Sequence, residues 1–189
     1  MLVAQTPSPR QRPHASAGFT LIELLVVIAM VAILGALAAP SMRNFAANQE
    51  LSGATSELMA AAMTARGTAI NRNMNVVLGP VGADWTTGWR VYVNKDSDKG
   101  YAAGTDELIA SGTPVPASVA LNPSTPAGCG SKSAFIFKPD GFLLVESSYG
   151  NGGIALKSAH TGRARCVVFD KIGRTRVCGD GADACGSPS

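Results

Sequence analysis

An apolar run near the amino terminus constrains this chain more than any other feature of its sequence. No charged residue occurs between Leu24 and Ala39, and with residues 19–22 the run approaches the roughly 20 residues that a helix needs to cross a bilayer. One carboxylate, Glu23, interrupts it. Because a charged side chain costs about 2.5 to 3.5 kcal/mol near the bilayer centre, and less near its edge, an acid in such a segment indicates a function. We therefore expect a membrane-inserted helix in which Glu23 has a specific role.

The overall composition allows one domain with a core and one long appendage. The chain has 189 residues and a mass of 19.3 kDa, with 46% hydrophobic and 15% charged residues. This balance excludes bulk disorder and is typical of a chain with a membrane-embedded segment. The histidines are His14 and His160, and no C-x-x-C or H-E-x-x-H spacing occurs. We therefore expect no metal site, no cofactor and no enzymatic activity.

Asn94, Asp96 and Asp98 alternate in a pattern that raises the alternative of a calcium loop. In such a loop, alternating oxygen ligands surround a hard cation, with a glycine at the sixth position and a glutamate at the twelfth. Here Lys99 stands at the glycine position and Thr105 at the glutamate position. An acidic turn is therefore favoured over a calcium site.

Residues 1–18 form a polar leader whose only charges are those of Arg10 and Arg12. Positive charge before an apolar helix favours the cytoplasmic side of a membrane. One alternative is a secretory signal peptide, because the small residues Ala36 and Ala38, followed by Ala39, fit a cleavage site. A disposable signal segment has no reason to carry Glu23, so a retained helix is favoured.

The junction between leader and apolar run reads Gly-Phe-Thr-Leu-Ile-Glu-Leu-Leu at residues 18–25. It resembles the prepilin processing motif of type IV pilins and type II secretion pseudopilins. The resemblance implies that a prepilin peptidase cuts after Gly18, on the cytoplasmic side, and methylates the new amino terminus at Phe19. It also implies that residues 19–40 stay on the mature protein as a transmembrane and assembly helix, with other pilins or pseudopilins as partners.

A new amino terminus at Phe19 gives Glu23 a defined physical setting. The carboxylate would lie one turn inside the helix, on the same face as the terminus and near the positive end of the helix dipole. An ammonium, its own or that of a neighbouring subunit, would compensate its charge. A subunit docked out of register would leave the charge uncompensated, which costs on the order of several kcal/mol. The resemblance thus assigns Glu23 to register selection in assembly; the alternative is a carboxylate that snorkels to the membrane interface.

The helix is expected to continue well beyond the apolar run. Small and apolar residues recur at three- and four-residue steps, which predicts that residues 41–72 form an amphipathic helix with one buried stripe. The expected stripe is Leu51, Ala54, Leu58, Ala61 or Ala62, Ala65 and Ala69. Pro40 removes a backbone hydrogen bond and is expected to kink the helix without ending it. About 52 residues from Phe19 give a rod of about 78 Å, longer than a membrane core, so its second half must pack in a globular head.

Residues 73–189 have the pattern of a β-rich head. Short runs rich in β-branched and aromatic residues alternate with glycine, proline and asparagine. These runs lie at 76–78, 89–93, 134–137, 142–145, 154–156 and 166–169. We expect a pilin-like α+β fold, in which one long helix packs on an antiparallel sheet. The prolines of residues 111–133 predict an irregular connection.

Three motifs in the head narrow the resemblance to the GspH and FimT branch of minor pilins and pseudopilins. They are Ala-Arg-Gly-Thr-Ala-Ile at 65–70, Trp-Thr-Thr-Gly-Trp at 85–89, and Ile-Phe-Lys-Pro-Asp-Gly at 136–141. The resemblance implies a single-pass protein of the inner membrane with a periplasmic head, which becomes part of a pilus or pseudopilus when assembled.

All four cysteines, Cys129, Cys166, Cys178 and Cys185, follow the apolar run, which fits an oxidising periplasm. They allow three pairings. We favour Cys166 with Cys178, because a hairpin that turns near Ile172 would set them opposite each other, and this leaves Cys129 with Cys185. Such a bridge would pin the terminal hairpin. Thiol catalysis is the alternative, but nothing in the sequence places a base near a thiol.

Positive charge is concentrated toward the carboxyl end. Residues 157–176 carry a net charge of +5, because Asp170 is their only acid. Their basic residues are Lys157, Arg163, Arg165, Lys171, Arg174 and Arg176. The arginine pairs 163/165 and 174/176 each stand in a G-R-x-R segment. In an extended chain the two arginines of a pair project to the same face about 7 Å apart, which is close to the phosphate spacing of a DNA strand.

Members of the FimT branch are associated with DNA uptake in natural transformation through a carboxyl-terminal G-R-x-R, and Arg174 and Arg176 match that motif in position. The resemblance therefore implies that the head binds double-stranded DNA non-specifically through phosphates. Arg163, Arg165 and Lys171 would add further contacts.

Two alternatives to DNA binding stay open. In the expected hairpin Arg174 would face Asp170, so the basic residues are also consistent with a cross-strand ion pair. The matching function is a structural subunit that primes pilus assembly or acts in type II secretion without touching DNA. A secreted enzyme is the third interpretation, and it is disfavoured by the shortage of catalytic residues.

Overall fold

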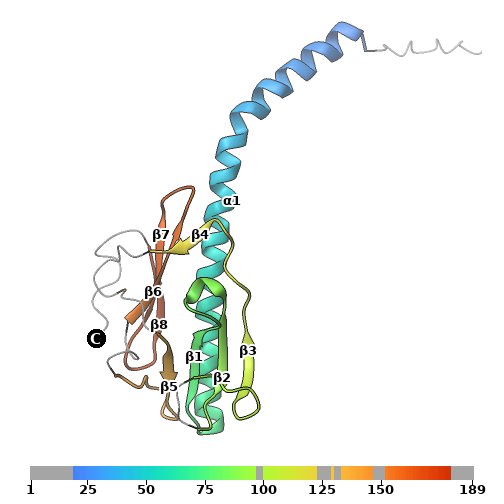
Figure 1. Cartoon of the computed structure of the whole chain (residues 1–189). Coiled ribbons are helices and arrows are strands. Elements are labelled where there is room, and N and C mark those ends of the chain that lie inside the picture. The colour runs from blue at the N-terminus through green and yellow to red at the C-terminus, as the bar shows by residue number, and fades with distance from the viewer. Residues whose placement is uncertain (1–18, 97–99, 123–128, 130–132, 147–151, 180–189) are drawn as a thin grey trace, which may run out of the picture. The chain divides into compact units, whose positions relative to one another are not determined.

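The computed structural model describes residues 19–96, 100–122, 129, 133–146 and 152–179 (Figure 1). The order of elements is α1 (Leu21–Arg72), β1 (Val76–Pro80), the short 3₁₀ helix η1 (Trp85–Thr87), β2 (Trp89–Val93), β3 (Glu107–Ser111), β4 (Val119–Leu121), β5 (Phe135–Phe137), β6 (Gly152–Ser158), β7 (Ala164–Phe169) and β8 (Thr175–Cys178). The predicted α+β class, with one long amino-terminal helix and antiparallel strands, is confirmed.

The chain divides into two compact units, residues 1–41 and 42–189. In the first unit, every described residue is exposed. Within the described residues α1 is the one helix long and apolar enough to cross a membrane, by length and composition. The helix passes Pro40 without ending, as expected, while the kink at Pro40 stays a prediction.

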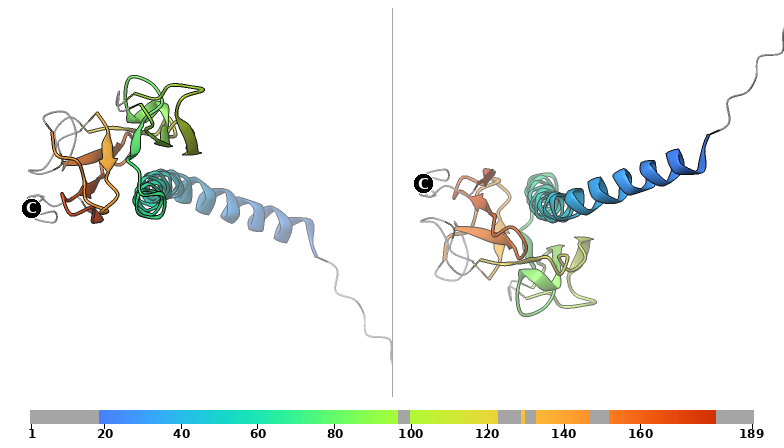
Figure 2. Two further views of the ribbon diagram at one scale, coloured as in Figure 1. Left: turned by 90° about the horizontal axis from the view of Figure 1, so that it is seen from below. Right: turned by 90° about the horizontal axis from the view of Figure 1, so that it is seen from above.

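The second unit contains the whole core of the described chain. From Ala47 to Ala69, α1 buries a stripe of mostly small residues, which matches the predicted stripe and adds Ala47 and Thr55. Small side chains let a helix approach a sheet closely, so helix and strands share one apolar cluster. Figure 2 shows the strands of two sheets lying on neighbouring sides of this part of α1.

The strands form two four-stranded antiparallel sheets, with orders β3-β2-β1-β5 and β4-β6-β7-β8. The expected single sheet is therefore divided. The chain changes sheet between β3 and β4, returns between β4 and β5, and leaves again for β6. Phe135 of β5 and Phe169 of β7 stack with ring centroids 3.7 Å apart, so the two sheets meet in one core.

Local predictions differ from the structure in three places. Residues 142–145 do not form a strand: Leu143 makes an isolated bridge with Phe137, while Phe142 and Val145 are exposed. Two strands were also not expected: β3 at residues 107–111, and the short strand β4 within the connection at 111–133. In all these places the sequence signal was too short to tell a strand from a loop that lies along one.

The disulfide between described residues joins Cys129 to Cys166, with Cα atoms 6.2 Å apart. The favoured pairings of Cys166 with Cys178 and of Cys129 with Cys185 are therefore wrong. The hairpin does set Cys166 opposite Cys178, but Cys129 reaches Cys166 from the connection between β4 and β5. That connection crosses from one sheet to the other, which local hairpin geometry cannot reveal. Cys178 is also disulfide-bonded, and Cys185 lies outside the described residues.

Gly153 on β6 makes room for this bond. A Cβ atom at that position would lie 2.7 Å from the Sγ atom of Cys166 and 2.9 Å from that of Cys129.

We expect peptide mapping without reduction to recover the peptide of Cys129 linked to that of Cys166. Replacing Cys129→Ser should lower the free energy of unfolding by about 3 to 4 kcal/mol, because the bond closes a loop with a sequence separation of 37 residues. Recovery of a Cys166–Cys178 peptide would contradict this pairing.

Candidate functional site

The start of α1 is closed by a reciprocal set of hydrogen bonds. The backbone N–H and the hydroxyl of Thr20 donate to the Glu23 carboxylate at 3.1 and 3.0 Å, and the Glu23 N–H donates to the Thr20 hydroxyl at 3.3 Å. This is a capping box, and its signal, a threonine three residues before a glutamate, was present in the sequence but not noted there. Glu23 thus already has a local role before any second subunit is considered. The cleavage residue Gly18 lies outside the described residues.

The terminal hairpin, β7 and β8, forms in the expected register. Val168 lies opposite Arg176 and Phe169 opposite Thr175. Its turn is closed by hydrogen bonds from the Asp170 N–H to the Arg174 carbonyl at 2.9 Å and from the Gly173 N–H to the Asp170 carbonyl at 2.8 Å.

Asp170 is a fully buried carboxylate at this turn, and it holds both arginines of the second G-R-x-R segment. Arg174 donates from Nη2 at 2.8 Å and from Nε at 2.9 Å, and Arg176 approaches the other oxygen at 3.4 Å. The expected contact of Arg174 with Asp170 is confirmed, and Arg176 shares it. The side chains of Arg174 and Arg176 remain 57% and 35% exposed. Each guanidinium is therefore oriented by the buried acid while part of it still faces solvent.

Arg66 on α1 ties a second turn to the hairpin. Its Nε donates to the Gly141 carbonyl at 3.1 Å, and its Nη2 donates to the Ile172 carbonyl at 3.3 Å. A Cβ atom on Gly173, whose φ is +76°, would lie 1.9 Å from the Gly141 carbonyl oxygen, so the two turns touch there. Arg66 belongs to the motif at 65–70, but its role could not be predicted from the sequence, because its two acceptors lie 75 and 106 residues away along the chain.

Further cations surround the same turns. Lys171 is exposed at the hairpin turn and accepts a backbone hydrogen bond from Leu143 at its carbonyl. Lys138 donates to Asp140 at 2.8 Å, and this hydrogen bond holds the pKa of the Asp140 carboxyl below its ordinary value. The turn end of the head, which we call the basic turn, consists of Arg66, Lys171, Arg174 and Arg176 with the buried Asp170.

Arg163 and Arg165 do not belong to the basic turn. About 17 Å of extended strand separates Arg165 from Asp170. Alternation along β7 places Arg165 on the face of Val167, toward α1, whereas Arg176 lies opposite Val168 and shares the other face. The five expected DNA-binding residues therefore lie in two groups at opposite ends of the hairpin. Only the fold separates them, since both groups follow the same sequence pattern.

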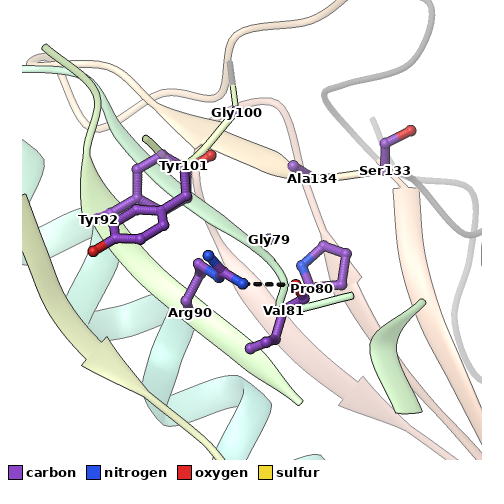
Figure 3. A pocket seen from close by; sticks show the side chains of 9 residues that line it. All are labelled: Gly79, Pro80, Val81, Arg90, Tyr92, Gly100, Tyr101, Ser133 and Ala134. Atoms are coloured by element: carbon purple, nitrogen blue, oxygen red, sulfur yellow. Dashed lines mark hydrogen bonds between the residues drawn. The ribbon is translucent and has the colours of Figure 1, made fainter. Parts of the chain in front are cut away.

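The head also has a pocket of about 250 Å³ on the outer side of the first sheet (Figure 3). Arg90 crosses it, donating to the Val81 carbonyl at 2.6 Å and lying 4.8 Å from the centroid of the Tyr101 ring. Tyr101 in turn meets Tyr92 edge to face. Ser133 also lines the pocket, and no histidine, cysteine or carboxylate is among the described residues that line it.

No group of three or more potential metal ligands gathers among the described residues. Asp98, a residue of the calcium alternative, lies outside them.

Family models and solved structures both relate this chain to pilin-like proteins. The family model of the type II transport protein GspH matches residues 54–173, and that of the prokaryotic N-terminal methylation motif matches residues 13–39. A crystal structure of the type IV minor pilin FimU from Pseudomonas aeruginosa superposes with a TM-score of 0.54 at 18% identity, covering 77% of this chain and 99% of that one. A second crystal form gives 0.51 at 17% identity, covering 74% and 100%. At such identity the likeness shows the fold. No curated protein matches the chain significantly.

Proposed function

The chain belongs to the family of the type II transport protein GspH, whose members are pilin-like minor pilins and pseudopilins, and from this premise we propose that it is a filament subunit anchored in the inner membrane by residues 19–40. A prepilin peptidase would remove residues 1–18 and leave Phe19 as the methylated amino terminus. The head would lie in the periplasm until the subunit enters a pilus or pseudopilus.

This proposal rests on a difference in burial between the two halves of α1. Residues 19–46 are all exposed, and most of residues 19–40 are apolar, while from Ala47 onward the same helix supplies the core of the head. An exposed apolar surface of this length requires cover, which a membrane provides before assembly and neighbouring helices provide afterwards. Glu23 would then distinguish the correct helix register from the others.

The first test is the amino terminus of the protein isolated from membranes or filaments. Mass spectrometry should give an intact mass without residues 1–18, and the first peptide should begin with N-methylated Phe19. Replacing Gly18→Val should leave the leader in place, because the peptidase would lose its cleavage site. A mature protein that begins near residue 39 would instead identify a signal peptide and contradict the proposal.

We further propose that the basic turn binds DNA non-specifically, as an uptake function in natural transformation would require. With the Lys138–Asp140 pair of the adjoining turn, five cations stand there against two carboxylates, and Lys171 and Arg174 are exposed. Asp170 holds the two guanidiniums in fixed positions, so less side-chain entropy would be lost when a phosphate binds. The contacts would be to phosphates of double-stranded DNA and would carry no sequence preference. Arg163 and Arg165 lie too far away to bind the same few phosphates.

Binding of a short DNA duplex to the head at low salt tests this second proposal. Lys171→Gln should weaken binding on the order of fivefold and lower the slope of log K against log salt by about 0.9, because one phosphate contact is lost. Lys157→Gln serves as the matched control and should leave binding unchanged. Lys157 is an exposed lysine on β6, opposite Ala164 and far from the basic turn. If the two variants lowered DNA affinity equally, or if the head did not bind DNA at all, the basic turn would not be a DNA-binding site.

A structural subunit without DNA binding is the second candidate, and the burial of Asp170 favours it. A carboxylate with no exposed surface needs cationic partners for the head to fold, so Arg174 and Arg176 have a sufficient structural role. Such a subunit would prime pilus assembly or act in type II secretion. A full-length protein that incorporates into filaments normally, and whose head shows no affinity for DNA at low salt, would support this candidate.

A further inference from the structure

A second pocket lies in the head between α1 and the start of β7. It has a volume of about 200 Å³. Its lining residues are Asn48, Leu51, Arg163, Ala164, Arg165 and Gly179. It therefore contains the first G-R-x-R arginines, which the basic turn does not use.

The loop between β6 and β7 is fixed against the helix at this place. The Thr161 hydroxyl donates to the Asn48 side-chain oxygen at 2.9 Å, which leaves the amide NH₂ of Asn48 available as a donor. The Ser158 N–H donates to the Arg163 carbonyl at 2.8 Å, and this hydrogen bond closes the loop between β6 and β7. Leu51 is 1% exposed and forms an apolar floor. The pocket is thus bounded by α1 on one side and by the start of β7 on the other.

The charges around this pocket differ from those of the basic turn. Two guanidiniums line it, and none of the described residues that line it is acidic. Arg165 is half-buried and makes no ion pair or side-chain hydrogen bond within the described part of the chain, whereas Arg174 and Arg176 share the buried Asp170. A partly desolvated guanidinium with its donors open is satisfied best by an anion with several oxygens, and a phosphate fits the fork of an arginine.

The position of the pocket along α1 indicates where the phosphate comes from. Asn48 follows Pro40 by eight residues, so at most about 12 Å of helix separates the pocket from the end of the apolar segment. Two more cations, Arg43 on α1 and Lys157 on β6, are exposed in the same part of the head. A basic pocket so few residues along the chain from a membrane-inserted segment can reach the headgroups of anionic lipids.

We propose that the pocket formed by Asn48, Arg163 and Arg165 binds the phosphate of an anionic phospholipid headgroup. This rests on the proposed membrane insertion of residues 19–40. Binding would hold the head against the membrane surface while the subunit waits for assembly, and would have to be released when the subunit leaves the membrane. Double-stranded DNA is the competing source of phosphate, and it has no comparable reason to meet this end of the head.

The experiment uses the head, residues 42–189, because every buried residue of the described chain lies at or after Ala47, so the core is complete without the apolar segment. The head is mixed with vesicles of phosphatidylcholine alone or of phosphatidylcholine with phosphatidylglycerol, and the bound fraction is measured by sedimentation. We expect binding only to the vesicles that contain phosphatidylglycerol. Arg165→Gln should reduce it about fivefold to tenfold, and Arg165→Lys should restore part of it, since a lysine keeps the charge but not the fork.

The matched control is Lys171→Gln, which removes one positive charge at the far end of the hairpin and should leave vesicle binding unchanged. If Lys171→Gln reduced vesicle binding as much as Arg165→Gln, net charge alone would explain the binding. The proposal that the pocket binds a lipid phosphate would then be wrong. Binding of a DNA duplex that falls with Arg165→Gln, without any vesicle binding, would assign the pocket to DNA instead. Failure of the anchor itself is seen separately, as release of the full chain from membranes by alkaline carbonate. Thermal melting of each variant confirms that it is folded.

Discussion

Replacing Arg174 and Arg176 together by alanine is expected to destabilise the head by about 3 to 5 kcal/mol. Both guanidiniums bind the carboxylate of Asp170, which has no exposed surface, so the double variant leaves a buried charge without a cation. For a unit of this size the loss corresponds to a melting temperature lower by about 10 °C. Chemical denaturation of the head, followed by tryptophan fluorescence, measures the effect directly.

The matched control removes the acid along with its partners. A triple variant, Asp170→Asn with Arg174→Gln and Arg176→Gln, contains no uncompensated charge and should recover most of the lost stability. If the double variant is as stable as the parent, the arginines contribute nothing to the fold and Asp170 is solvated in some other way.

This control also decides how DNA binding can be tested. Loss of binding in the double alanine variant would not separate a lost phosphate contact from a partly unfolded head. The triple variant removes the same two guanidiniums while keeping the hairpin intact. A head that folds, lacks both arginines and no longer binds the duplex would therefore support the basic turn as the DNA site.

Replacing Glu23→Ala is expected to reduce incorporation into filaments by more than about tenfold. In the proposed assembly the carboxylate compensates an ammonium at Phe19, and an unpaired charge in an apolar surrounding costs on the order of several kcal/mol, where about 1.4 kcal/mol corresponds to a factor of ten. The measurement is the ratio of this protein in sheared filaments to that in membranes, by immunoblot with equal total expression.

The capping box makes a matched control necessary, because Glu23 also closes the helix with Thr20. Thr20→Ala removes the cap, at a cost of about 1 kcal/mol to the start of the helix, but keeps the carboxylate. Incorporation of this variant should be close to that of the parent. If both variants fail equally, the capping of α1 and not the pairing of Glu23 explains the requirement.

Much of the local structure could be predicted from the sequence. The buried stripe of α1 follows from small residues at helical spacing, and β2 begins and ends where its alternating run does. The hairpin register, with Cys166 opposite Cys178, follows from a turn of fixed length between two short runs. Each of these depends on neighbours within one helix or one hairpin, where the spacing along the chain already sets the spacing in space.

Apart from the local errors at 142–145 and in the strands that were missed, the errors concern contacts between distant segments. The pairing of Cys129 with Cys166 depends on a connection that crosses between two sheets. The role of Arg66 depends on two turns more than 70 residues away. The capping box is a different case, because its signal was local and was overlooked when Glu23 was considered only for assembly.

The sequence by itself determined the kind of protein this is: an apolar helix with a prepilin motif, which continues into the core of a β-rich head. Periodicity and a short cleavage motif are local properties, so they can be read directly from the order of residues along the chain. Only the tertiary structure decided which charges act together. Two segments with the same G-R-x-R pattern became different sites, because strand alternation and strand length placed one beside a buried carboxylate and the other in a pocket with no acid among its described lining residues.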